Sequence, residues 1–125
     1  MTFSIAGLTV EVAGLACLPP IMRNLEPFVA EACGAGEPVC TLECGRALAD
    51  AVGRPALENV FDGKTLRLWL TPDGYAVSLQ FDGGGGTFRL RASHDWRSVT
   101  TDCRAETVAD CMALGDFIMI SFIYS

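Results

Sequence analysis

The stretch that decides the fold is TLRLWLTPDGYAVSLQFDGGGGTFRLRA, residues 65–92. Apolar and polar side chains alternate at 65–70, 75–81 and 88–92, and successive side chains of a strand point to opposite faces. Residues 71–74 (TPDG) have the proline, Asx and glycine chemistry of a tight turn, and an aspartate with four glycines, 82–86, joins the next pair. The pattern predicts an antiparallel meander of three strands.

The composition is that of one globular domain. A chain of 125 residues can bury a hydrophobic core without disulfides or a structural metal, and 50% apolar residues argue against disorder. A net charge of −6 disfavours nucleic acid as a partner. The longest apolar run, 117–124, is far shorter than the roughly 20 residues of a membrane span, and no signal-peptide pattern opens the chain. We therefore expect a single domain, 1–125, in the cytoplasm, without nucleic acid or membrane partners.

The six cysteines lack the spacing of a small secreted disulfide scaffold. A zinc site from Cys33, Cys40, Cys44 and His94 is one interpretation, but zinc sites favour close C-x-x-C pairs. Cys40 and Cys44 on one strand would also lie roughly 13 Å apart. The sequence instead predicts reduced thiols that pack as small hydrophobic side chains.

Shorter elements are expected around the meander. In chain order these are a bulged strand or two short strands at 1–12, irregular turns at 21–32, a loop at 34–38, a strand at 39–44, a helical turn within 47–60, and a last strand at 94–102. Pro27 interrupts the second of them, because proline cannot continue a regular helix. Gly53 and Pro55 end the helical turn.

From Arg104 onward the apolar period becomes helical. Beyond Cys111 apolar residues lie on nearly every side, with Asp116 as the only charge, and a sheet of three to five strands would cover one side only. We therefore expect an α+β fold, a mostly antiparallel sheet with this helix packed on one face. Because the pattern reaches Ser125 without a cap, the chain is interpreted as a piece of a longer protein. The expected domain or dimer interface consists of Phe117, Ile118, Ile120, Phe122 and Ile123.

The candidate catalytic motifs lack the residues or the neighbouring elements that their chemistry requires. Residues 62–65 (DGKT) resemble the end of a phosphate-binding loop, but Glu58 stands where that loop needs glycine, and a strand follows. Glycines 83–86 lie between two predicted antiparallel strands, where no helix N-terminus could hold an anion. His94 is the only histidine and has no assignable Ser or Cys partner. We predict no catalytic, cofactor-binding or metal-binding residue in this segment.

One polar sheet face carries a candidate binding surface. Arg67, Arg89 and Arg91 fall on the polar faces of neighbouring predicted strands, together with Trp69. Guanidinium groups bind carboxylates and phosphates in a forked geometry, so these four residues could meet an acidic ligand, a peptide or a phosphate. An ordinary solvated sheet face is the alternative.

Residues 3–12 (FSIAGLTVEV) and 25–28 (LEPF), with the ending DFIMISFIYS at 116–125, resemble the amino-terminal region of bacterial HPr kinase-related, phosphoenolpyruvate carboxykinase-like proteins. The resemblance implies a non-catalytic accessory domain for packing, substrate engagement or oligomerisation. Its partner would be its own C-terminal kinase-like domain or a second copy of itself. The P-loop, ATP and Mg would belong to that kinase-like domain beyond Ser125. The alternatives are a stand-alone module that binds an acidic ligand through the arginine face, and an independent small enzyme.

Overall fold

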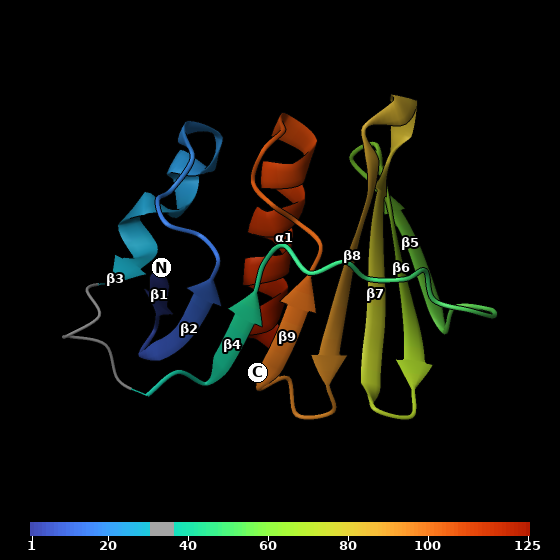
Figure 1. Cartoon of the computed structure of the whole chain (residues 1–125), viewed down its shortest axis with the longest axis horizontal. Helices are drawn as coiled ribbons and strands as arrows, with labels where there is room; N and C mark the ends of the chain where they lie inside the picture. Colours follow the sequence, from blue (N-terminus) through green and yellow to red (C-terminus); the bar gives the residue numbers. More distant parts are fainter. Residues whose placement is uncertain (31–36) are drawn as a thin grey trace.

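The computed structural model describes residues 1–30 and 37–125, and their fold is α+β as expected. These residues form a sheet of nine strands in the order β3-β1-β2-β4-β9-β8-β7-β6-β5, and helix α1 packs on one side of it (Figure 1). The strands are β1 (Thr2–Ile5), β2 (Leu8–Ala13), β3 (Val29–Ala30), β4 (Cys40–Glu43), β5 (Leu57–Phe61), β6 (Lys64–Thr71), β7 (Gly74–Phe81), β8 (Gly86–Ser93) and β9 (Ser98–Thr101). The helical elements are the 3₁₀ segments η1 (Pro20–Phe28) and η2 (Asp82–Gly84) and the α-helix α1 (Val108–Tyr124).

The predicted meander is confirmed as β6, β7 and β8, paired antiparallel along their whole length. The turn before β7 requires its glycine, because Gly74 has φ +150° and a Cβ there would lie 2.0 Å from the carbonyl oxygen of Ala92. Asp62 and Gly63 form the turn of the β5–β6 hairpin, so the DGKT motif is a hairpin turn and not a phosphate-binding loop. The glycine run forms η2 and joins β7 to β8.

The remaining strands complete the sheet through two parallel pairs. The first residues form a two-stranded hairpin, β1–β2, with Ala6 and Gly7 at positive φ in its turn. The strand expected at 39–44 is confirmed as β4, and the one expected at 94–102 is confirmed at 98–101 as β9. Residues 94–97 instead form the turn between β8 and β9, with Trp96 at φ +59°. Strand β4 lies parallel to both β2 and β9, so it connects the N-terminal hairpin to the meander.

Two local predictions need correction or restriction. The helical turn expected within 47–60 is wrong: after β4 the chain runs irregularly to β5 across the face of the sheet opposite α1 (Figure 1). The irregular turns expected at 21–32 are observed as η1 with Pro27 inside it, followed by β3. Residues 31–36, which include the end of the turns expected at 21–32 and part of the loop expected at 34–38, lie outside the described residues.

Helix α1 starts at a capped N-terminus. The Thr107 hydroxyl accepts a hydrogen bond from the Asp110 backbone N–H at 3.1 Å. The buried Asp110 carboxylate accepts the backbone N–H groups of Arg104 and Glu106, which lie just before the helix. The Thr107 contact satisfies a backbone donor of the first helical turn, and the Asp110 contacts fix the segment that leads into the helix. None of the described helices is long and apolar enough to cross a membrane.

The apolar helix is buried more fully by its own domain than expected. Phe117 and Ile118 are fully buried and Phe122 nearly so, in one core with strands β2, β4, β7, β8 and β9. The sheet is wider than the three to five strands anticipated, and η1 packs against the helix from one side. Phe117, Ile118 and Phe122 are therefore core residues and cannot form the expected interface.

Candidate functional site

The four predicted residues of the polar sheet face do come together. Strand register aligns two rows across the meander, Arg67–Ser78–Arg89 and Trp69–Ala76–Arg91. Directly opposed residues of paired strands share a face, so the small β7 side chains lie between long ones from β6 and β8. The result is a trough of about 310 Å³ with a low floor and walls of arginine and tryptophan. We call the set Arg67, Trp69, Ser78, Arg89 and Arg91 the arginine trough.

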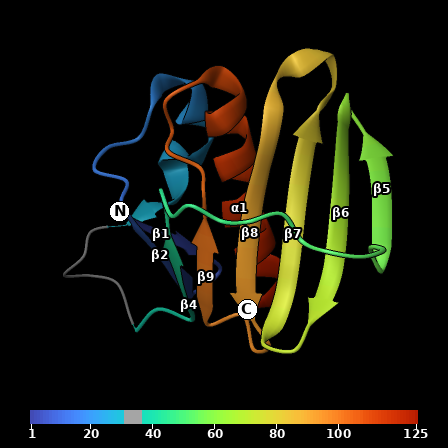
Figure 2. The ribbon, with the colours of Figure 1, turned by 45° about the vertical axis from the view of Figure 1, so that its right-hand side comes forward.

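A segment of the chain, residues 46–56, lies over this trough and is called the strap. It follows β4, passes in front of β8, β7 and β6, and reaches β5 (Figures 1 and 2). The Arg89 Nε donates to Asp50 Oδ1 at 2.5 Å, and the Trp69 indole Nε1 donates to the Gly53 carbonyl oxygen at 3.0 Å. Arg91 Nη2 donates to the Ala49 carbonyl oxygen. The strap thus supplies an acceptor to three of the four residues that were predicted as a ligand face.

The charges of the trough are balanced within the chain. Arg89 Nη1 also donates to Asp102 Oδ2 at 2.9 Å, and these hydrogen bonds to Asp50 and Asp102 raise the pKa of Arg89. Arg67 Nε donates to Glu58 Oε2 at 2.7 Å. Two carboxylates therefore pair with Arg89 and one with Arg67, whereas Arg91 donates to backbone carbonyl oxygens. The three positive charges of the trough are matched in number by these three carboxylates, so the expectation of a partly basic patch is corrected. The partners were missed because Asp50 and Asp102 are 39 and 13 residues from Arg89 in sequence.

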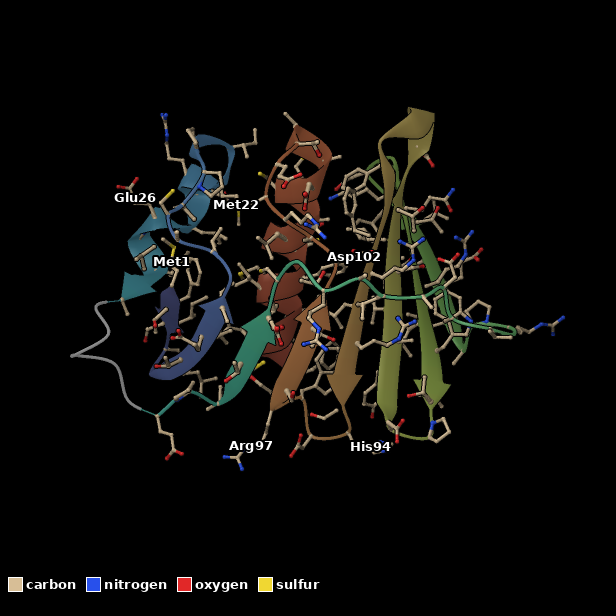
Figure 3. All side chains as sticks on the ribbon, viewed as in Figure 1. Met1, Met22, Glu26, His94, Arg97 and Asp102 are labelled. Atoms are coloured by element: carbon tan, nitrogen blue, oxygen red, sulfur yellow. The ribbon has the colours of Figure 1, made fainter. Side chains whose placement is uncertain are left out.

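The single histidine and the cysteines form no metal site in the described part of the chain. Among residues 1–30 and 37–125 no group of three His, Cys, Asp or Glu side chains could hold a metal ion, and Cys33 lies outside these residues. His94 Nε2 lies 3.0 Å from the Pro72 carbonyl oxygen at one end of the sheet, where Figure 3 places it apart from Asp102. Cys40 is buried, and burial raises the pKa of its thiol to about 11, as it does for Cys44.

A second candidate surface lies on the outward side of α1. Val108, Met112, Met119 and Ile123 recur at helical spacing and are all exposed. Between the two methionines, a Cβ at Gly115 would have no neighbour within 4 Å. A hollow of about 360 Å³ forms there. Its lining comes from η1 (Ile21, Met22, Asn24, Leu25), from α1 (Cys111, Met112, Gly115, Asp116, Met119) and from Lys64.

A second, smaller groove of about 230 Å³ adjoins the C-terminal end of α1. The helix packs on β2, β4 and β8, and β5 and β6 extend beyond it (Figure 1). The groove is lined by Leu57, Phe61, Leu66, Leu68 and Val77 of the strands, by Ile120, Ile123 and Tyr124 of the helix, and by Trp96. Stacking of Trp96 between Tyr75 and Tyr124, at 5.6 and 5.3 Å between ring centroids, fixes one wall. We call the hollow and this groove together the α1 docking face.

An ion pair that the sequence did not indicate lies in the lining of the hollow. Lys64 Nζ lies 3.0 Å from Asp116 Oδ2, so the pair connects β6 to α1. The same ammonium lies 5.5 and 5.8 Å from the ring centroids of Phe61 and Phe81, within cation–π range. Lys64 belonged to the DGKT motif, and its role in the described structure is to hold the helix to the outer strands.

The residues expected at an interface divide between core and surface. Ile120 and Ile123 line the groove, whereas Phe117, Ile118 and Phe122 face the core. Met112 and Met119 were missed as surface residues, although their helical spacing was visible in the sequence. Spacing alone could not tell which side of an all-apolar helix the sheet would cover.

Comparison of the chain with family models, curated proteins and solved structures found no match. A proposed function therefore rests on the geometry of the two surfaces and on the resemblance of residues 3–12, 25–28 and 116–125.

Proposed function

We propose that this chain is a non-catalytic accessory domain, and that its α1 docking face packs against the kinase-like domain of an HPr kinase-related protein. The observation that supports the proposal is the apolar surface on and beside α1, formed by Met112, Met119, Ile120, Ile123 and the outer strands. Soluble monomers rarely leave large contiguous apolar patches in water, and such patches commonly mark protein–protein contacts.

The shape of the docking face suits a protein partner. Helices pack by inserting ridges of side chains into grooves, and the hollow at Gly115 offers such a groove between Met112 and Met119. Methionine side chains are flexible and polarisable, so they adapt to a partner surface. The Lys64–Asp116 pair in the lining of the hollow would add a polar contact to this otherwise largely apolar face.

The partner, the cofactors and the compartment follow from the family resemblance. ATP and Mg would bind in the kinase-like domain, and the whole protein would be cytoplasmic. The accessory domain would contribute packing, substrate engagement or oligomerisation. A second copy of this chain on the same face is the other occupant that the proposal allows, and light scattering of the purified protein distinguishes the two.

The test starts from the reading frame beyond codon 125, which should continue into a domain with a Gly-Lys-Ser/Thr loop. In that full-length protein, Ile123→Glu should loosen the docking and increase proteolysis between the two domains. Val60→Glu is the matched control, because Val60 is 66% exposed against 69% for Ile123, and strand alternation puts Val60 on the other side of the sheet from Phe61. A stop codon after Ser125, or equal cleavage of both variants, would overturn the proposal.

A further inference from the structure

We infer that the arginine trough is a binding site for a carboxylate, and that the Asp50 side chain of the strap occupies it as an internal competitor. The site lies on the side of the sheet opposite α1 (Figure 1), so the inference is independent of the docking face. The trough would take a ligand, whereas the α1 docking face would take a protein partner.

The trough holds a guanidinium group in a fixed orientation. Asp102 binds Arg89 twice: Oδ1 accepts the Arg89 backbone N–H at 2.8 Å and Oδ2 accepts Nη1 at 2.9 Å. Asp102 is largely buried, and the Thr87 carbonyl oxygen accepts a further bond from Nη1. These contacts hold Arg89 from behind, and the Nε edge of the guanidinium points to the strap. An arginine oriented in this way is preorganised for an incoming carboxylate.

The Asp50 carboxylate, which now binds the Arg89 Nε, is weakly held. Asp50 is 80% exposed although its carboxylate lies 2.5 Å from Nε, and exposed ion pairs contribute little to stability. The strap around it has neither helix nor strand, and its neighbour Val52 is almost fully exposed. A ligand could therefore displace the Asp50 side chain without disturbing the sheet below.

The charge balance selects the chemical class of the ligand. Without Asp50, the three guanidinium groups of the trough have two carboxylate partners, Glu58 at Arg67 and Asp102 at Arg89. One negative charge restores neutrality, and a carboxylate has the same geometry as the side chain that it would replace. The Trp69 ring forms an apolar wall, and Ser78 and Gln80 add polar groups beside it. A volume of about 310 Å³ is at the lower end of the range for small-ligand sites.

Two sources of carboxylate fit this chemistry. A free small acid would use Arg89 and the polar groups of the floor. An acidic peptide in an extended conformation would also use the donors that now bind strap carbonyl oxygens, Arg91 to Ala49 and Trp69 to Gly53. The shared element is a carboxylate on Arg89.

The experiment uses two probes, succinate and the capped peptide N-acetyl-Ala-Asp-Ala-Val-Gly-amide, which copies strap residues 49–53 and so includes the Gly53 carbonyl oxygen. Binding is followed by NMR at the Arg89 Nε–H and Trp69 Nε1–H signals. Asp50→Ala should bind at least one probe up to about fivefold more tightly than the wild-type chain, the factor that an exposed ion pair can supply. Adding Arg91→Gln to Asp50→Ala should weaken the binding of the peptide more than the binding of succinate.

Glu26→Ala is the matched control, because it removes one exposed acid from η1, at the other end of the sheet (Figure 3). Saturable binding of succinate alone would assign a free acid, and binding of the peptide alone would assign an acidic peptide. Equal affinities of Asp50→Ala and Glu26→Ala would mean that only net charge matters and would overturn the inference. The absence of saturable shifts for both probes with Asp50→Ala would overturn it as well.

Discussion

Replacing Asp116 with asparagine should destabilise the domain more than replacing its partner Lys64 with methionine. The side chain of Lys64 is 11% exposed, whereas that of Asp116 is 39% exposed. Few water molecules can reach the Lys64 ammonium, so water cannot take the place of the Asp116 carboxylate as its hydrogen-bond partner. The Asp116 carboxylate is more exposed, so water can hydrate it when the ammonium is removed. Removing Asp116 therefore leaves the mostly buried Lys64 charge unpaired, which costs more than leaving the exposed Asp116 charge unpaired.

The two substitutions differ in expected magnitude. Asp116→Asn keeps the size of the side chain but leaves the Lys64 ammonium with an amide and the faces of Phe61 and Phe81, at 5.5 and 5.8 Å. Hydrogen bonds to charged groups contribute about 1.5–3 kcal/mol, and water can reach this pair, so we expect a loss of about 1–2 kcal/mol. Lys64→Met retains the packing of the aliphatic stem and should cost less than about 1 kcal/mol.

Urea unfolding followed by tryptophan fluorescence measures both effects, since Trp96 lies in the core beside Tyr124. The double variant should lose no more stability than Asp116→Asn alone, because neither charge then remains. A larger loss for Lys64→Met than for Asp116→Asn would refute the reasoning, and would mean that the cation–π contacts and not the carboxylate hold Lys64.

Three further predictions concern the core, one turn and the thiols. Phe117→Ala should cost about 3–5 kcal/mol in urea unfolding, because Phe117 is fully buried between helix and sheet. Gly74→Ala should prevent or severely weaken folding as judged by circular dichroism, because its Cβ would lie 2.0 Å from the Ala92 carbonyl oxygen. The pKa values of Cys40 and Cys44 are raised to about 11 from 9.0 by burial. Unfolded thiols therefore lose their protons first, so stability should be unaffected below pH 9 and fall as pH rises from about 9 to about 11. Thermal melts across that interval measure the fall.

The parts of the fold that the sequence predicts are those set by local pattern. Alternation and turn chemistry were enough for β6, β7 and β8, because each pairs with its neighbour in sequence. The helical period was enough for α1. The parallel pairing of β4 with β2 and β9 was not predictable in this way. It depends on contacts between segments far apart in the sequence, and the order of apolar and polar residues within each segment does not reveal its neighbours.

The strap shows why local pattern failed at 47–60. Leu48 and Val52 are four residues apart and indicated a helical turn, but neither is buried in the folded domain. The segment is held instead by Arg89, Arg91 and Trp69, whose strands form elsewhere in the sequence. The candidate arginine face was thus predicted correctly as a cluster, whereas the acids and carbonyl oxygens that occupy it were not.

The most direct test of the docking proposal is the rate of methionine oxidation by hydrogen peroxide in the full-length protein. Met112 and Met119 are 43% and 38% exposed in this domain, and Met22 is 2% exposed and serves as the internal standard. If the α1 docking face is covered, both exposed methionines should oxidise about as slowly as Met22, and Ile123→Glu should accelerate them. Rapid oxidation of Met112 and Met119 in the full-length protein, unchanged by Ile123→Glu, would contradict the proposal.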